Sequence, residues 1–215
     1  MQNYPPLLLT DKKTGEQCLS LTGSQLKTAA ESLGAAFSRD PFMAYVFPNA
    51  IAREKNIAKV FLPLIRCNLQ YGNVEFVQNG KGVLLWISGD SLPLTLPMLT
   101  YSGMIWMPFR IGQTAFKRIE SHEAFCEHKT KIKVPQGYAY LWVFGVHPEF
   151  SGKGLGKQML QSALRNMQRC GHSSCTLRTD NPRNVALYEH LGFTQTYAGT
   201  EPSSQLPFWI MSHTL

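Results

Sequence analysis

The sequence predicts an α/β fold, in one domain, built on a mixed sheet. Two helical segments precede a β-hairpin, an irregular block follows it, and strands then alternate with helices toward the end of the chain. One strand, within residues 138–156, leads directly into a glycine-rich loop that opens a helix. The 215 residues contain no internal repeat and no obvious linker, and they are enough to bury a sizeable core.

Helical periodicity marks two segments in the first half of the chain. Apolar residues recur three and four positions apart after Thr22 or Ser24, either of which is expected to cap a helix that runs to Phe37. An aromatic-rich segment follows at 42–47. A second helix is predicted at 52–71, with its apolar residues on one side.

Strand patterns appear on both sides of these helices. Residues 1–20 form a leader, with a short edge strand predicted at 17–21. Residues 73–78 and 82–88 are predicted strands, and the Asn79–Gly80 pair between them is a strong hairpin signal.

The block at 91–132 interrupts the sheet. Proline and methionine dominate its first half, and residues 112–129 are predicted to form a helix of mixed polarity. Such an insertion forms a lid or substrate-pocket wall, or it is a plain packing element, and both interpretations stay open.

The last third alternates strands and helices. The strand before the glycine-rich loop spans 140–146. The helix after this loop has an apolar face and ends before Gly171. The remaining elements are strands at 174–178, 193–197 and 207–212 and a helix at 182–190.

Composition narrows the class of protein. The net charge of +7 fits a polyanionic ligand such as a nucleotide cofactor, or a nucleic acid or an acidic surface. The positive charges are scattered without a long Lys/Arg run, so we expect no nucleic-acid binding. The apolar block at 92–111 is broken by prolines and a glycine, and the N-terminus has no basic region before its apolar run. We therefore expect no membrane span and no signal peptide.

The cysteines indicate a reducing compartment. The five residues include no CxxC pair, and an odd number favours reduced thiols, several of them buried, in a cytoplasmic protein. They are Cys18, Cys67, Cys126, Cys170 and Cys175.

The glycine loop matches neither of two familiar phosphate loops. Gly152, Gly154 and Gly156 give GxGxG rather than the GxGxxG of dinucleotide-binding folds. The Walker loop needs one more residue before its lysine and a Ser or Thr after it, where this chain has Gln158. A glycine loop at a helix N-terminus still makes an anion site from backbone N–H groups, so we expect it to hold a pyrophosphate.

Two motifs in order resemble the GNAT superfamily of N-acetyltransferases. In the first, Val146-His147-Pro148 is followed by the segment SGKGLG at 151–156. In the second, Asn181 is followed seven residues later by Tyr188 and then by Gly192-Phe193. The resemblance covers a signature region at 138–193 and implies that 1–215 is a single GNAT domain. The fold it implies is a central, mostly antiparallel sheet with a splayed parallel strand pair, flanked by helices.

The resemblance implies acetyl-CoA as the donor and a primary amine as the acceptor. It implies that the pantetheine arm adds as a pseudo-strand beside the strand before the loop, where Gly145 removes a side chain at the closest approach. A backbone N–H near Val146 would stabilise the oxyanion. The cofactor-binding residues it implies are Phe144, Gly145, Val146, Ser151, Gly152, Lys153, Gly154, Leu155, Gly156, Lys157, Asn181 and Asn184. Ser151 departs from the family's Gln or Arg, so Lys153 or Lys157 would supply charge there. The asparagines have an alternative use as helix N-caps.

The resemblance assigns Tyr188 as the general acid that protonates the departing thiolate. The strand at 140–146 carries no carboxylate. The identity of the general base therefore stays open, and the alternatives are several side chains or deprotonation through water. The side-chain candidates are Asp40, Glu75, Tyr138, Tyr140 and His147. No Cys or Ser occupies a nucleophile position that the family supports, which favours direct attack in a ternary complex.

Partners and metals are less constrained. His122, Cys126 and His128 suggest a metal, but only the first two share a helical face and no fourth ligand stands out, so we expect none. The acceptor is a small-molecule or peptide amine, and a homodimer stays open as the assembly. The alternative function is a non-catalytic acyl-CoA-binding module of the same fold, which the missing long donor at Ser151 and the missing base would favour.

Overall fold

The computed structural model describes residues 7–9, 21–77 and 80–215. In the described part a seven-stranded sheet has the order β1-β2-β3-β4-β5-β7-β6. The strands are β1 (Leu7–Leu9), β2 (Asn73–Val77), β3 (Gly82–Ser88), β4 (Ala139–Val146), β5 (Ser174–Thr179), β6 (Thr194–Thr200) and β7 (Pro207–Thr214). Neighbours are antiparallel except β4 and β5, which are parallel, so the predicted mixed, mostly antiparallel sheet is confirmed.

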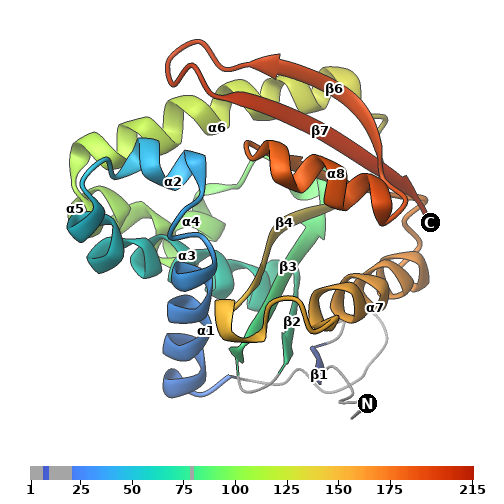
Figure 1. Cartoon of the computed structure of the whole chain (residues 1–215), viewed down its shortest axis with the longest axis horizontal. Helices are drawn as coiled ribbons and strands as arrows, with labels where there is room; N and C mark the ends of the chain where they lie inside the picture. The colour runs from blue at the N-terminus through green and yellow to red at the C-terminus, as the bar shows by residue number, and fades with distance from the viewer. Residues whose placement is uncertain (1–6, 10–20, 78–79) are drawn as a thin grey trace.

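Helices cover both faces of the sheet (Figure 1). They are α1 (Gly23–Ala36), α2 (Pro41–Val46), α3 (Ala50–Tyr71), α4 (Leu96–Ser102), α5 (Met107–Ile111), α6 (Gln113–Lys133), α7 (Leu155–Arg169) and α8 (Pro182–His190). Alternation along β3 divides the core in two. Val83, Leu85 and Ile87 pack with α1 to α6, whereas Leu84 and Trp86 pack with α7 and α8.

Local sequence explains how the early helices begin. The Thr22 side chain accepts from Gln25 N in a capping box that opens α1. Asp40 accepts from the backbone N–H groups of Phe42 and Met43, and Pro41 occupies the first position of α2. Asn49 caps α3 in the same way. The first predicted helix is therefore confirmed with Thr22 as its cap.

The β4 strand changes partner along its length. Its pairing with β5 covers only Ala139–Leu141, and the two strands diverge beyond that point. Its register with β3 shifts between Leu85↔Val143 and Trp86↔Leu141, which leaves Trp142 as an extra residue. The expected splayed parallel pair is present, and the bulge lies three residues before Gly145.

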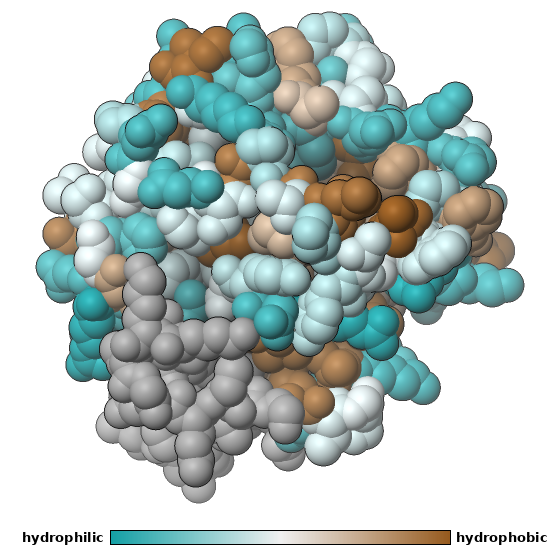
Figure 2. Space-filling model, turned by 180° about the vertical axis from the view of Figure 1, so that it is seen from behind, coloured by the Kyte–Doolittle hydropathy of each residue, from teal (hydrophilic) through white to brown (hydrophobic). Residues whose placement is uncertain are grey.

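The block at 91–132 contains no described strand. It folds into α4, the short 3-10 helix η3 (Met104–Trp106), α5 and most of α6, and the helices pack beside α3 and α2. It leaves large apolar side chains exposed, among them Leu96, Tyr101, Ile105, Trp106 and Phe109. Apolar side chains also interrupt the hydrophilic surface of the face seen from behind (Figure 2).

The N-terminal predictions are only partly testable. The strand expected at 17–21 lies outside the described residues except for Leu21, and Asn79 of the hairpin turn also lies outside them. The described edge strand on this side of the sheet is β1, which pairs with β2. Among the described helices, none combines the length and apolar character needed to cross a bilayer.

Candidate active site

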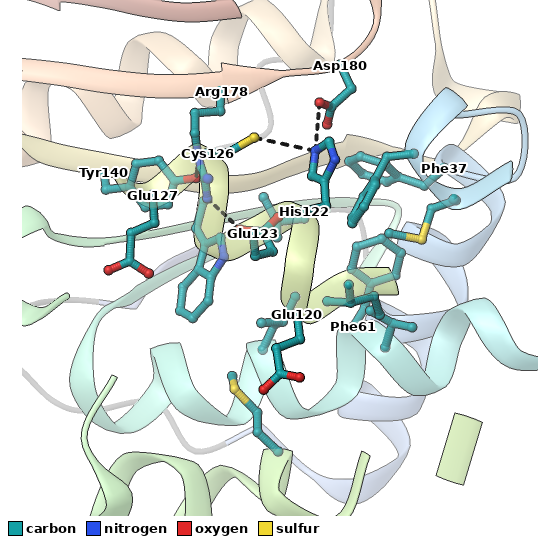
Figure 3. Close-up of a pocket in the computed structure, with 18 of the residues that line it drawn as sticks. Phe37, Phe61, Glu120, His122, Glu123, Cys126, Glu127, Tyr140, Arg178 and Asp180 are labelled. Atoms are coloured by element: carbon teal, nitrogen blue, oxygen red, sulfur yellow. Dashed lines mark hydrogen bonds and ion pairs between the residues drawn. The ribbon is translucent and has the colours of Figure 1, made fainter. Parts of the chain in front are cut away.

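A cavity of about 690 Å³ lies between the splayed strands and the inserted helices. Its walls are mainly aromatic and aliphatic and come from Phe37 after α1, from α2 and α3, from the 92–111 region and from α6. Residues of β4, β5 and α8 close it on the sheet side. Figure 3 shows that polar side chains gather at one part of this otherwise apolar space. The block at 91–132, for which a pocket wall and a plain packing element were both left open, contributes residues to the wall of this cavity.

The diverging segment of β4 forms one wall. Trp142, Val143 and Phe144 line the cavity, and this segment lies beyond the last residue that pairs with β5. The bulge turns both Trp142 and Val143 toward the α1–α6 side of the sheet, so the usual alternation is interrupted there. The strand edge that faces β5 is thus open along residues 142–146.

Gly145 has a different neighbour from the one expected. A Cβ atom at this position would lie 2.7 Å from Leu33 Cδ2 and 3.2 Å from Ala36 Cβ, both on α1. Close packing of α1 on β4 therefore accounts for the glycine. Only the backbone of Gly145 remains available at the open strand edge.

The glycine loop has the backbone geometry of an anion site. Gly152 and Gly154 have φ values of 74° and 80°, and the space beside each is empty. Gly154 is the N-cap of α7, and no side chain caps this helix start and no acidic residue lies in its first turn, so the helix dipole is not offset there. A Cβ on Gly156 would lie 3.3 Å from Phe144 Cζ, so this glycine lets α7 approach β4.

The other predicted loop residues surround this helix start. Ser151, Lys153 and Lys157 are exposed, and the ammonium of Lys153 lies 5.2 Å from the centre of the Phe150 ring. None of the loop residues, nor Val146, lines the cavity.

Tyr188 and Asn184 of α8 both line the cavity. Tyr188 is 8% exposed, and its ring packs edge-on against Phe193. Burial, with a smaller contribution from Cys175, raises the pKa of its phenol above the usual value, so the hydroxyl keeps its proton at neutral pH. Asn184 Nδ2 donates to Thr179 Oγ1 at 3.2 Å.

Asn181 acts locally as a helix cap. Its side chain accepts a hydrogen bond from Arg183 N at 3.1 Å at the start of α8. The capping alternative therefore holds for this residue, which does not line the cavity.

The five candidate bases separate into two groups. Asp40 and Tyr140 line the cavity, whereas Glu75, Tyr138 and His147 do not. Burial raises the pKa of Asp40 to about 6, against the lowering effect of its backbone hydrogen bonds. Burial raises the pKa of the Tyr140 phenol well above its usual value, so Tyr140 stays protonated at neutral pH.

A buried charge network joins α6 to the sheet. Arg178 Nη2 donates to Glu123 Oε2 at 2.6 Å, and Arg178 Nε donates to the Tyr140 hydroxyl at 2.7 Å. Burial alone would lower the pKa of Arg178, but Glu123 together with smaller contributions from Tyr140 and Cys126 outweighs it, so the pKa is raised and the guanidinium stays charged. Sequence reasoning did not single out Arg178 or Glu123, because no local motif connects β5 with a helix 55 residues away.

A second polar cluster surrounds His122 (Figure 3). Its Nε2 lies 2.9 Å from Asp180 Oδ1 and 3.6 Å from Cys126 Sγ. Burial alone would lower the pKa of His122, but the hydrogen bonds to Asp180 and Cys126 outweigh it and raise the pKa to about 10. His128 is exposed and does not join the cluster. Asp180, which sequence reasoning missed, supplies the third group.

Known proteins match the part of this chain that contains the two sequence motifs. A family model described as "Acetyltransferase (GNAT) family" matches residues 111–193. The mycothiol acetyltransferase of Streptomyces avermitilis is 37% identical over 68 residues, which are 31% of this chain and 22% of that protein. The match therefore spans about a fifth of that relative's own length.

Solved structures match over almost the whole chain. Arylalkylamine N-acetyltransferase 2 from Aedes aegypti superimposes with a TM-score of 0.56 and 12% identity, over 91% of this chain and 97% of that chain. The PaiA N-acetyltransferase from Thermoplasma acidophilum, solved with coenzyme A, gives a TM-score of 0.53 and 14% identity over 92% and 97%. At these identities the likeness concerns the fold. The matched family model over residues 111–193, the paired motifs and the splayed strands together support the GNAT superfamily for this chain.

Proposed function

We propose that the protein transfers an acetyl group from acetyl-CoA to a primary amine by direct attack in a ternary complex. The observation that carries this proposal is one cavity that contains the open β4 edge, Tyr188 and an apolar wall with acidic groups. The names of the matched proteins, which are acetyltransferases, support the reaction class.

The donor would bind along β4. Its pyrophosphate would accept hydrogen bonds from the backbone N–H groups at the start of α7, and Lys153 or Lys157 would add positive charge. Its pantetheine arm would pair with the backbone of residues 142–146, where β5 has diverged. This arrangement brings the thioester to the end of the cavity near Tyr188, and a backbone N–H of the open edge would stabilise the oxyanion.

Tyr188 would act as the general acid. The amine nitrogen forms a bond to the thioester carbon, the C–S bond breaks, and the phenol gives its proton to the departing thiolate. A phenol kept neutral by burial is suited to this role, because its proton is still present when the thiolate leaves.

The acceptor side of the cavity favours a cation with an apolar body. Two cationic side chains that line the cavity, Arg178 and His122, are outnumbered by acidic ones. These acidic residues are Asp40, Glu120, Glu123, Glu127 and Asp180. An ammonium group would be attracted there, while the aromatic and aliphatic walls would take an apolar substituent.

Asp40 would accept the proton that the amine must lose before attack. It lines the cavity, and its pKa of about 6 leaves it ionised at neutral pH yet basic enough to take a proton. Its Oδ1 accepts from Phe42 N and Met43 N, which fixes the carboxylate in place.

A thiol-release assay with acetyl-CoA and a panel of amines, combined with calorimetry of CoA binding, tests the proposal. The panel includes phenylalkyl- and alkylamines, a polyamine and short peptides with free N-termini. Turnover on an apolar amine supports the proposal. Turnover only on peptides would support acetyl transfer to an amine but contradict the apolar small-molecule acceptor. Tight CoA binding without turnover on any amine would instead support the acyl-CoA-binding module.

A further inference from the structure

Three potential metal ligands meet in the cavity wall. His122 and Cys126 are one turn apart on α6, and Asp180 follows the last residue of β5. The atoms His122 Nε2, Cys126 Sγ and an Asp180 carboxylate oxygen all lie within 4.8 Å of one another. His122 and Cys126 are buried, and all three residues line the cavity.

One separation between these atoms matches a tetrahedral ion, and a second is slightly too short for one. With metal–ligand distances of about 2.0 to 2.3 Å, neighbouring ligand atoms around Zn²⁺ lie about 3.3 to 3.7 Å apart. The His122 Nε2 to Cys126 Sγ distance is 3.6 Å, within this range. The 2.9 Å separation of His122 Nε2 and Asp180 Oδ1 is that of a hydrogen bond, and it needs to open by about 0.4 Å when an ion replaces the shared proton.

The far side of the imidazole is held by groups typical of the outer sphere of a metal site. His122 Nδ1 lies 3.2 Å from Ser204 Oγ and 3.6 Å from Glu201 Oε2. Glu201 is 3% exposed and is itself fixed by backbone N–H groups of Ser203 and Ser204. A carboxylate at Nδ1 orients the ring and leaves Nε2 as the coordinating nitrogen. Phe42 stacks on the ring at 4.3 Å and restricts its rotation.

We propose that His122, Cys126 and Asp180 bind one divalent ion of the Zn²⁺ type. A nitrogen, a thiolate and a carboxylate form a ligand set that suits Zn²⁺ and excludes Mg²⁺ and Ca²⁺, which prefer oxygen ligands. Coordination displaces the protons of the Cys126 thiol and of His122 Nε2, and the two anionic ligands then balance the charge of the ion. The fourth position faces the cavity and is open to water or to an acceptor group. The site does not depend on the proposed acetyl transfer.

Metal titration of the whole 215-residue chain, tag-free and chelator-treated, tests this assignment. We expect one Zn²⁺ per chain by calorimetry, and with Co²⁺ a thiolate-to-metal charge-transfer band that Zn²⁺ removes. Cys126→Ser should abolish the band, and Asp180→Asn should weaken binding strongly. Glu201→Gln, which keeps all three ligands, should weaken Zn²⁺ binding by about 10- to 100-fold.

Cys67→Ala is the matched control, because Cys67 is a buried thiol on α3 that does not line the cavity. It should retain the band and the stoichiometry, and circular dichroism checks that each variant is folded. Zn²⁺ binding that is absent, or that Cys126→Ser and Asp180→Asn leave at the wild-type affinity, would overturn the proposal. A Co²⁺ complex without the charge-transfer band in the wild-type protein would do the same.

Discussion

His122 Nε2 lies 2.9 Å from Asp180 Oδ1 and so connects α6 to the end of β5 across 58 positions of sequence. This contact closes the polar part of the cavity, because His122 comes from the inserted helix and Asp180 from the sheet. It also sets the inserted helix α6 against β4 and β5, the parallel strands that diverge beyond Leu141. The inserted helix is therefore part of the site and not an appendage.

Removal of the Tyr188 hydroxyl tests the general acid. Tyr188→Phe should lower kcat by about 100-fold and leave the KM for acetyl-CoA nearly unchanged, because the ring still packs against Phe193. Steady-state kinetics with the best amine measures this, and Tyr71→Phe, which is 37% exposed, is the control. Turnover at the wild-type level from about pH 6 to about pH 9 would show that another group donates the proton.

Asp40→Asn separates the base from the helix cap. Asparagine is as good an N-cap as aspartate, so α2 should keep its start while the basic oxygen is lost. In chelator-treated wild-type protein, kcat/KM should fall as pH drops below about 6, because the carboxylate becomes protonated. The variant should lose about 100-fold in activity near neutral pH and lack this acidic limb.

An unchanged pH profile in Asp40→Asn would exclude Asp40 and favour deprotonation through water. Thermal unfolding of the variant should remain at the wild-type temperature, which distinguishes a lost base from a damaged helix.

The loop glycines allow a matched test of cofactor binding. Gly154→Ala and Gly171→Ala both place a side chain at positive φ, 80° and 88°, with empty space around it. Each should lose about 1 kcal/mol of stability. Only Gly154→Ala should weaken CoA binding, by about tenfold, because it disturbs the N–H groups at the start of α7.

S-acetylpantetheine, which lacks the pyrophosphate, should react equally with both glycine variants. Equal loss of CoA affinity in the two variants would mean that the loop does not hold the pyrophosphate.

Glu75 should make stability depend on pH. The side chain is 1% exposed, and neither carboxylate oxygen has a hydrogen-bond partner among the described residues. Burial raises its pKa from 4.5 to about 8, so the folded protein keeps a proton that the unfolded chain releases. Stability should therefore fall as pH rises from about 4.5 to about 8 and then level off.

Glu75→Gln removes this pH-dependent penalty. The variant should be more stable than the wild type by about 2 kcal/mol at pH 8, with a smaller difference at pH 5. Urea unfolding at both pH values measures it, and Glu31→Gln, an exposed carboxylate on α1, is the control. The same stability difference at both pH values would show that Glu75 does not carry the titration.

The sequence by itself predicted most of the helices and strands and the proposed donor half of the site. Periodicity, caps and turn residues are local, so the helix at 182–190 and the strand at 82–88 were predicted with the bounds observed. The glycine loop and Tyr188 were found because each lies within a short motif. Gly145 was located as well, although its reason is the packing of Leu33 and Ala36 on α1.

Only the tertiary structure brought together the polar groups of the proposed acceptor side. The inserted helix carries His122 and Cys126 one turn apart, but Asp180 joins them only because β5 ends beside α6. Arg178 and Glu123 likewise meet across that boundary, at 2.6 Å. Such contacts depend on how the helices pack on the sheet. Because packing brings together residues that are distant in sequence, no local sequence pattern predicts these contacts.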